Sequence, residues 1–229
     1  GYVSEEKKKI IRKVIEETGY QPSSQAQMLR TKKTKLVGVI LPKIDSNTIS
    51  REVAGISDIL TKQGYQLILA NTNNSTEEEL KYLSLFRDNQ VDGVIFIATI
   101  LTKQHKDMLK EYRVPIVLLG QHLEGYPCIY QDDYKAAMSL TEELVKSGKK
   151  FGYITVTDKD EAVGKKRLSG VEEVLKKNRI ELNSDCVKCG SFTLESGYEK
   201  TEELFNEYPD IDTLICATDT MAVGAVSWL

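Results

Sequence analysis

Leu36-Val37-Gly38-Val39-Ile40-Leu41 is the stretch that decides the fold of this chain. Its apolar residues follow one another without polar alternation, which is typical of a parallel strand covered by helices on both faces. Similar strand patterns recur and alternate with helical patterns; the strands are expected at 65–70, 91–98 and 115–120, and the helices at 47–63, 75–89 and 102–112. Strand–helix repeats with short links predict a doubly wound parallel sheet.

The same alternation starts again after residue 131. A short strand at 128–130 leads to Gln131-Asp132-Asp133, where we expect the chain to cross into a second lobe. In that lobe the pattern predicts strands at 151–156, 185–189 and 213–216, and helices at 132–147, 161–178, 195–207 and from 219 onward. The sequence therefore predicts an α/β protein with one lobe over 36–131 and another over 132–229.

The composition separates a basic head from an acidic body. The chain has 229 residues with 41% hydrophobic content, enough for one large or two ordinary domains. Residues 1–35 contain nine Lys/Arg and four Glu, whereas the rest contains 22 Lys/Arg and 30 Asp/Glu. This asymmetry suggests that only the head meets nucleic acid. No apolar run approaches the roughly 18 residues of a membrane-spanning helix, so a membrane protein is not expected.

The chemistry-bearing residues do not indicate an enzyme. His105 and His122 are both expected at the surface, and no glycine-rich nucleotide motif follows a strand. Cys186 and Cys189 have CxxC spacing but lack a second such pair or a nearby His pair, so strand alternation is preferred over a metal site. The four cysteines are interpreted as reduced core residues of a cytoplasmic protein. We expect neither a metal nor a cofactor.

The head contains one amphipathic helix and a second, shorter helical segment. Ser4 can cap the first helix and Gly19 can end it. Its apolar face consists of Ile10, Ile11, Val14 and Ile15. After Pro22, Ser23 or Ser24 can cap a helix of about two turns, which is too short to be stable alone in water. The basic residues that follow favour a phosphate backbone as partner, with a solvated linker as the alternative.

Polar residues follow the strands in both lobes. In open parallel sheets, ligands bind outside the carboxyl ends of the strands. The residues at these ends are Lys43, Asp45, Ser46, Thr99 and Gln121 in the first lobe, and Asp158, Ser191, Phe192, Thr218 and Asp219 in the second. Carboxylates, hydroxyls and an aromatic face suit a small, hydroxyl-rich ligand held between two lobes.

Three runs in the head resemble the lactose-repressor (LacI/GalR) family of transcription factors. They are Gly1-Tyr2-Val3-Ser4-Glu5, Ile15-Glu16-Glu17-Thr18-Gly19-Tyr20-Gln21-Pro22 and Leu29-Arg30-Thr31-Lys32. The resemblance implies that residues 1–35 are the end of a helix-turn-helix headpiece and a hinge helix, which enters the minor groove of operator DNA as part of a dimer and wedges Leu29 into a base step. Packing of Leu29 on its own domain is the alternative. The implied DNA-binding residues are Ser23, Ser24, Gln25, Met28, Leu29, Arg30 and Lys32.

The two lobes resemble the type I periplasmic-binding-protein fold, which forms the sensor of the same family and whose second lobe continues there beyond the equivalent of residue 229. The segment 164–171 resembles the one whose arginine contacts the effector, in this sequence Arg167, and 217–222 resembles the motif whose acid does so, in this sequence Asp219. Phe192 matches an aromatic residue that stacks on the ligand. The structural alternatives are a surface arginine, a helix N-cap and a core phenylalanine. With the strand-end residues, the expected effector-binding set is Lys43, Asp45, Ser46, Gln121, Arg167, Phe192 and Asp219.

Within the family, the segments 130–133, 164–167 and 216–220 are most similar to trehalose operon repressors, whose effector is a phosphorylated disaccharide. Lys43 is consistent with a phosphate, whereas Gln121 stands where those repressors have an arginine, so a neutral sugar stays open. The resemblance implies a homodimeric, sugar-responsive repressor of a carbohydrate-utilisation operon, with a sugar or a sugar phosphate such as trehalose 6-phosphate between the lobes. The alternative is a cytoplasmic sugar sensor that does not bind DNA.

Overall fold

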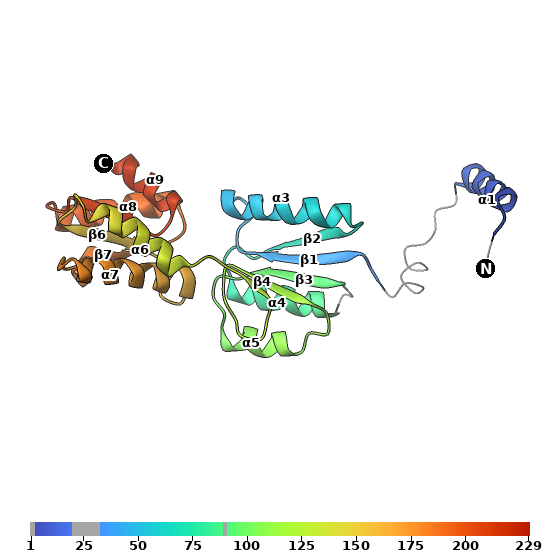
Figure 1. Ribbon diagram of the computed structural model, residues 1–229, viewed down its shortest axis with the longest axis horizontal. Helices are drawn as coiled ribbons and strands as arrows, with labels where there is room; N and C mark the ends of the chain where they lie inside the picture. Colours follow the sequence, from blue (N-terminus) through green and yellow to red (C-terminus); the bar gives the residue numbers. More distant parts are fainter. Residues whose placement is uncertain (1–2, 20–32, 89–90) are drawn as a thin grey trace.

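The computed structural model describes residues 3–19, 33–88 and 91–229. A basic helix, α1 (Glu5–Thr18), precedes two lobes that each contain a parallel sheet (Figure 1). This confirms the predicted fold class, a two-lobed α/β protein with parallel sheets. None of the described helices is long and apolar enough to cross a membrane.

The first lobe contains a parallel sheet in the order β2-β1-β3-β4-β5. Its strands are β1 (Leu36–Leu41), β2 (Gln66–Asn71), β3 (Gly93–Ile97), β4 (Ile116–Leu119) and β5 (Cys128–Ile129). Helix α3 (Asn47–Lys62) covers one face, and α4 (Thr76–Asp88) and α5 (Lys103–Lys110) cover the other (Figure 1). The apolar run 36–41 is therefore a central strand with helices on both faces, as its lack of alternation predicted.

Gly38 explains how α4 packs closely on β1. A Cβ atom at this position would lie 2.6 Å from the ring of Phe86, so only glycine leaves room for the ring against the strand. Phe86 belongs to the cluster that also contains Ile40, Leu83 and Phe96. A second cluster, with Val39 and Leu41, packs on the α3 face. The strand thus contributes to two cores, one on each side of the sheet.

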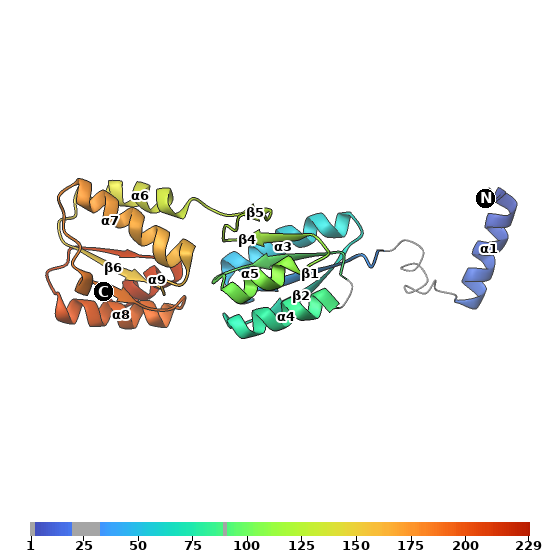
Figure 2. The ribbon, with the colours of Figure 1, turned by 90° about the horizontal axis from the view of Figure 1, so that it is seen from below.

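The second lobe has a parallel sheet in the order β7-β6-β8. Its strands are β6 (Phe151–Thr155), β7 (Val187–Cys189) and β8 (Thr213–Cys216). Its helices are α6 (Asp133–Leu144), the π-helix η1 (Glu161–Lys166), α7 (Arg167–Lys177), the 3-10 helix η2 (Ser184–Cys186), α8 (Leu194–Glu207) and α9 (Asp219–Trp228). Helices α6 and α7 pack on one face of the sheet, and α8 and α9 on the other (Figures 1 and 2).

The carboxyl ends of the two sheets face each other. Strand β5 ends at the connector, residues 130–132, and α6 begins there and leads away from the first lobe (Figure 2). Strand β6 then returns toward the first lobe, and its two neighbours run parallel to it. Because ligands of open α/β sheets bind beyond the carboxyl ends of the strands, this arrangement brings both candidate edges to the junction of the lobes.

Two expectations about side-chain environment were wrong. His105 is not a surface residue: its side chain is 0% exposed and its Nε2 atom lies 3.2 Å from Oε2 of Glu79, which is also buried. The capping turn at the start of α5 holds the imidazole inside the lobe, because Nδ1 lies 2.8 Å from the Thr102 hydroxyl. Cys189 is exposed at the end of an edge strand, whereas Cys186 is buried as expected.

Candidate functional site

The first-lobe part of the predicted site lies just after β1. The amine of Lys43 is 3.6 Å from the carboxylate of Asp45; the Lys43 side chain is 40% exposed and that of Asp45 is 69% exposed. Ser46 stands at the N-cap of α3 without a capping hydrogen bond from its side chain. A cation, an acid and a hydroxyl therefore remain accessible at this edge. Among the described residues, no hydrogen bond or ion pair joins this trio to Arg167 or Asp219.

Gln121 is buried at the carboxyl end of β4. Its side-chain nitrogen donates to the carbonyl oxygen of Thr99 at 2.8 Å and to Oδ1 of Asp160 at 3.0 Å. Thr99 follows β3 in the same lobe, whereas Asp160 belongs to the second lobe. Gln121 is only 6% exposed, so a ligand can reach its amide nitrogen only by replacing one of these bonds.

Asp160 is a residue that the sequence analysis missed. We expected an ordinary helix over 161–178 and considered Asp158, which is exposed, as the strand-end acid. Asp160 instead caps the π-helix η1 and accepts hydrogen bonds from the backbone of Ala162 and Val163. Burial raises the pKa of the Asp160 carboxyl, more than these bonds lower it. The sequence did contain one signal for Asp160: an Asp directly before a helical pattern is a typical helix N-cap.

Arg167 is held in a fixed orientation at the start of α7. Its Nε and Nη2 atoms each lie 2.7 Å from Oδ1 of Asp133, and Nη1 donates to the carbonyl oxygen of Ala217 at 2.5 Å. Asp133 is buried at the start of α6, whereas about a third of the Arg167 side chain is exposed. A guanidinium with its direction set by two fixed acceptors, and with a free side toward solvent, suits recognition of an anionic or hydroxyl-rich ligand.

Asp219 and Phe192 lie at the same edge of the second lobe. Asp219 is the first residue of α9 and is exposed, while the neighbouring Thr218 accepts the capping hydrogen bond from Met221. Asp219 is therefore not the N-cap considered as its structural alternative. Phe192 is half-buried and packs against Ile154 and Met221, so it belongs partly to the core. Arg167 bonds to Ala217, two residues before Asp219, which brings both to one edge of the sheet.

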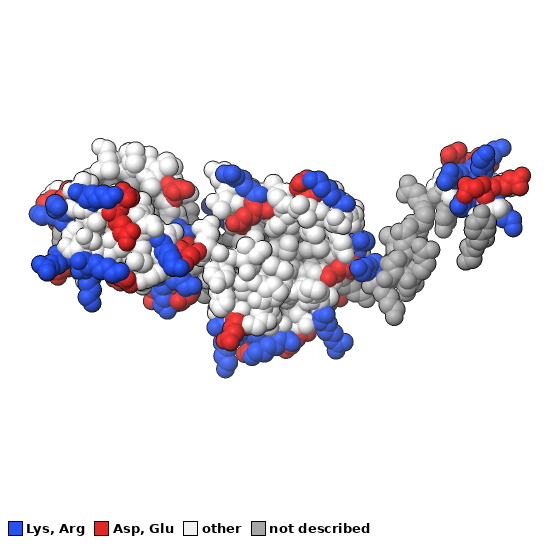
Figure 3. All heavy atoms as spheres, in the orientation of Figure 1, with Lys and Arg blue, Asp and Glu red and all other residues white. Residues whose placement is uncertain are grey.

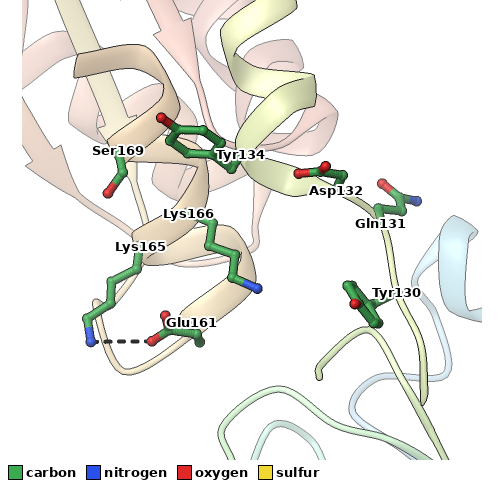
Figure 4. A pocket seen from close by; sticks show the side chains of 8 residues that line it. All are labelled: Tyr130, Gln131, Asp132, Tyr134, Glu161, Lys165, Lys166 and Ser169. Carbon is green, nitrogen blue, oxygen red and sulfur yellow. Dashed lines mark hydrogen bonds and ion pairs between the residues drawn. The ribbon is translucent and has the colours of Figure 1, made fainter. Parts of the chain in front are cut away.

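A hollow of about 280 Å³ lies beside the connector rather than among these residues (Figure 4). It is lined by Tyr130, Gln131, Asp132, Tyr134, Glu161, Lys165, Lys166 and Ser169. Its charged groups interact with other residues: Lys165 pairs with Glu161 at 3.3 Å, Asp132 pairs with Lys135, and the Lys166 amine lies 5.8 Å from the centre of the Tyr130 ring. We do not assign the effector to this hollow.

The predicted DNA-binding residues Ser23, Ser24, Gln25, Met28, Leu29, Arg30 and Lys32 lie outside the described residues. Helix α1 is described, and charged side chains of both signs cover it (Figure 3). Its apolar residues are exposed as well; they are Ile10, Ile11, Val14 and Ile15. Gly19 ends the helix in a left-handed conformation, as predicted. Within the described ranges, no group of three His, Cys, Asp or Glu side chains could hold a metal ion.

Two parallel-sheet lobes whose carboxyl edges face each other have the architecture of a periplasmic-binding-protein type fold. The chain belongs to the family described as "Periplasmic binding proteins and sugar binding domain of LacI family", which matches residues 34–229. It is 30% identical over 225 residues to the sucrose operon repressor of Staphylococcus xylosus, covering 98% of this chain and 69% of that protein. The transcription regulator CcpA of Lactococcus lactis is a structural relative with 33% identity and a TM-score of 0.76, covering 84% of this chain and 71% of that one.

The expected special similarity to trehalose repressors is not confirmed. The trehalose repressor from Escherichia coli has a TM-score of 0.75 over 85% of this chain and 74% of that one, but only 24% sequence identity. That is lower than the 33% identity to CcpA, and it supports the shared fold alone. The comparisons therefore show the family of this chain and do not identify a particular sugar as its effector.

Proposed function

We propose that this chain comprises the effector-sensing lobes, the end of the headpiece and the hinge of a sugar-responsive transcription repressor. The repressor acts in the cytoplasm and is not an enzyme. The proposal divides the chain into a head and hinge over 1–35 and two sensor lobes over 36–131 and 132–229. The observation that carries it is the guanidinium of Arg167, which Asp133 and Ala217 orient at the carboxyl edge of the second sheet. That edge faces the carboxyl edge of the first sheet (Figure 2).

The effector in this proposal is a sugar or a sugar phosphate bound between the lobes. Arg167 donates to a hydroxyl or phosphate oxygen, Asp219 accepts from sugar hydroxyls, and Phe192 covers the apolar face of the ring. Lys43 is the cation that would distinguish a phosphorylated sugar from a neutral one. A relative named for sucrose, and a cellobiose complex of a regulator 25% identical to this chain, make neutral disaccharides suitable first probes.

Effector binding is best tested by thermal shift with sucrose, cellobiose, trehalose, trehalose 6-phosphate and glucose 6-phosphate. A ligand at 100 times its dissociation constant stabilises the folded state by about 2.7 kcal/mol, which gives a clear rise in melting temperature. We expect at least one sugar to raise it, and Arg167→Ala to abolish the rise. Lys176→Ala, an exposed cation on the same helix, is the matched control. If Arg167→Ala shows the same sugar-induced rise in melting temperature as the wild type, Arg167 does not contact the sugar.

DNA contact through the hinge is the second part of the proposal. The residues involved are Ser23, Ser24, Gln25, Met28, Leu29, Arg30 and Lys32, and their basic groups predict binding that weakens with salt. For three phosphate contacts, the affinity for a labelled duplex should fall roughly 40-fold between 50 and 200 mM salt. Leu29→Ala should weaken binding, whereas Leu140→Ala, at an exposed leucine of α6, should not. Absence of any salt-dependent binding would favour the sugar sensor without DNA function.

A homodimer completes the proposal. Helix α3 contains no fully buried residue, and it lies beside the edge strand β2. Ile59 of α3 and Leu69 of β2 are exposed on the same side of the sheet, because Leu69 shares its face with Leu67, which packs on the α3 side. They offer an apolar surface to a second copy of the chain. Sedimentation of the wild type as a dimer and of Ile59→Glu as a monomer is the expected outcome. A wild type that stays monomeric at all concentrations would contradict it.

A further inference from the structure

A buried hydrogen bond joins the two lobes between Gln121 and Asp160, which are 39 residues apart. Asp160 is 2% exposed, and its Oδ1 atom accepts from Gln121 at 3.0 Å and from the backbone of Ala162 and Val163 at 3.1 and 3.0 Å. A buried carboxylate is costly unless it is hydrogen-bonded, and bonds to a charged acceptor are about twice as strong as neutral ones. Separating the lobes at this point would break the bond from Gln121 and leave the Asp160 carboxyl with only its two backbone donors.

On the first-lobe side, Gln121 is fixed by a polar chain that continues into the core. Its nitrogen also donates to the Thr99 carbonyl, and the Thr99 hydroxyl donates to Oε1 of Glu79 at 3.4 Å. The other oxygen of Glu79 lies 3.2 Å from His105. A buried donor that loses its partner leaves a desolvated group behind, which favours keeping the bond from Gln121 to the Thr99 carbonyl. Gln121 is therefore tied to the first lobe.

On the second-lobe side, Asp160 determines where η1 begins. Besides the two bonds to its side chain, its carbonyl oxygen accepts from the backbone of Gly164 and of Lys165, each at 3.0 Å. Arg167 follows η1 directly. Gly164 keeps this turn tight, because a Cβ atom there would collide with the Thr157 carbonyl oxygen. A shift of Asp160 thus moves the whole turn that places Arg167.

We propose that Asp160 is a positioning residue, and that the Gln121–Asp160 latch holds η1 and Arg167 in a fixed place against the carboxyl edge of the first lobe. Gln121 then acts by holding the lobes rather than as a free ligand donor. The link to effector binding rests on the proposed function, whereas the latch itself does not. An effector that enters between the lobes can change their angle only by its differential affinity for the latched and unlatched arrangements.

A purely local role for Asp160, as the cap of η1, is the competing explanation. The two roles differ in their dependence on Gln121, because the cap bonds come from Ala162 and Val163 and need no first-lobe partner. Gln121→Glu removes the amide donor and places a second carboxylate against Asp160. At a pH high enough to ionise both carboxyl groups, their repulsion breaks the latch, while the cap bonds from Ala162 and Val163 stay intact. Combining Gln121→Glu with Asp160→Asn supplies a new donor toward the introduced carboxylate and keeps an acceptor for the cap.

Hydrogen exchange of the ligand-free chain tests the latch. Gln121→Glu loses the two bonds that the amide nitrogen donates, to Thr99 and to Asp160. We therefore expect hydrogen exchange at least about ten-fold faster in peptides covering 130–133 and 161–167. We also expect a larger radius of gyration in solution scattering. The double variant should return both toward wild type. Gln104→Glu, at an exposed glutamine of α5, is the matched control and should change neither.

The latch is refuted if Gln121→Glu leaves exchange unchanged, or if the double variant fails to restore it. Should Gln121→Glu not fold, Gln121→Met keeps nearly the same volume without either donor, and it should show the same faster exchange relative to Gln104→Met. Because no effector is added, the result is independent of whether any sugar binds. A chain that binds sugar but exchanges normally in these variants would overturn the latch and leave the proposed function standing.

Discussion

Thr34 donates two hydrogen bonds to Asp92, one from its backbone N–H at 2.8 Å and one from its hydroxyl at 2.9 Å. The backbone N–H of Lys35 adds a third bond to the same carboxylate at 3.1 Å. Thr34 lies just before β1 and Asp92 just before β3, so these bonds fix residues 34 and 35 to the amino edge of the first sheet. The three bonds therefore hold the residues that lead into β1 against the start of β3.

Asp92→Ala should loosen this junction. The variant removes the acceptor of three hydrogen bonds, and partly buried donors left without a partner cost about 1–3 kcal/mol. We expect the free energy of unfolding in urea to fall by that amount, with faster hydrogen exchange at residues 33–36. Asp58→Ala, which removes only an exposed ion pair with Lys62, should cost much less. Equal losses in the two variants would show that the junction adds no stability.

The same contact should give a pH dependence below pH 4. Burial acts to raise the pKa of Asp92, but the hydrogen bonds from Thr34 and Lys35 outweigh it, so the pKa lies below its ordinary value of 3.8. A lowered pKa means that the contribution to stability is present in full above pH 3.8 and is lost as the pH falls through the folded-state pKa. The stability gap between wild type and Asp92→Asn should therefore close in acid, and a gap that stays constant would contradict this.

Arg167→Lys should separate orientation from charge. Lysine keeps a positive charge near Asp133 but lacks the fork that contacts Asp133 and Ala217 together. Removing one partner of a buried pair costs about 3–5 kcal/mol, and we expect less in this case because Arg167 is partly exposed. Urea titration should show a loss larger than that of Lys176→Ala, and any sugar-induced thermal shift should shrink. Unchanged sugar binding would mean that charge alone suffices.

Glu79 and His105 should behave as a coupled pair. Both side chains are buried, so replacing only one leaves an uncompensated polar group inside the first lobe. We expect His105→Leu or Glu79→Leu to cost about 3–5 kcal/mol each, and the double variant to cost clearly less than their sum. Thermal or urea unfolding of all four proteins measures the coupling. Strict additivity would show that the two residues do not depend on each other.

Gly164→Ala and Gly55→Ala should have opposite effects. At Gly164 a Cβ atom would collide with the Thr157 carbonyl oxygen, so we expect destabilisation of about 1–3 kcal/mol. Gly55 lies within α3, and no atom lies within 4 Å of the place that an alanine methyl group would take, so alanine should stabilise the helix by about 0.5–1 kcal/mol. Melting temperatures of the two variants test this comparison. A stable Gly164→Ala would show that the turn before Arg167 is not tight.

The fold followed from periodicity, whereas parts of the site did not. The apolar run 36–41 and its later counterparts predicted strands within a few residues of their observed bounds, because burial on both faces leaves a local signature. The polar strand ends were also readable, since topology brings the carboxyl ends of parallel strands to one edge. Asp160 was missed because a cap residue looks the same in sequence whether it faces solvent or another lobe.

By itself the sequence determined the alternation of strands and helices, the two lobes, and which residues follow each strand. Only the tertiary structure decided that His105 is buried against Glu79, that Asp133 and Ala217 orient Arg167, and that Gln121 bonds to Asp160. The physical reason is the sequence separation of the interacting residues. Secondary structure reflects the polarity of residues close together in the chain, whereas the partner of a buried polar group is fixed by packing between segments far apart in the chain.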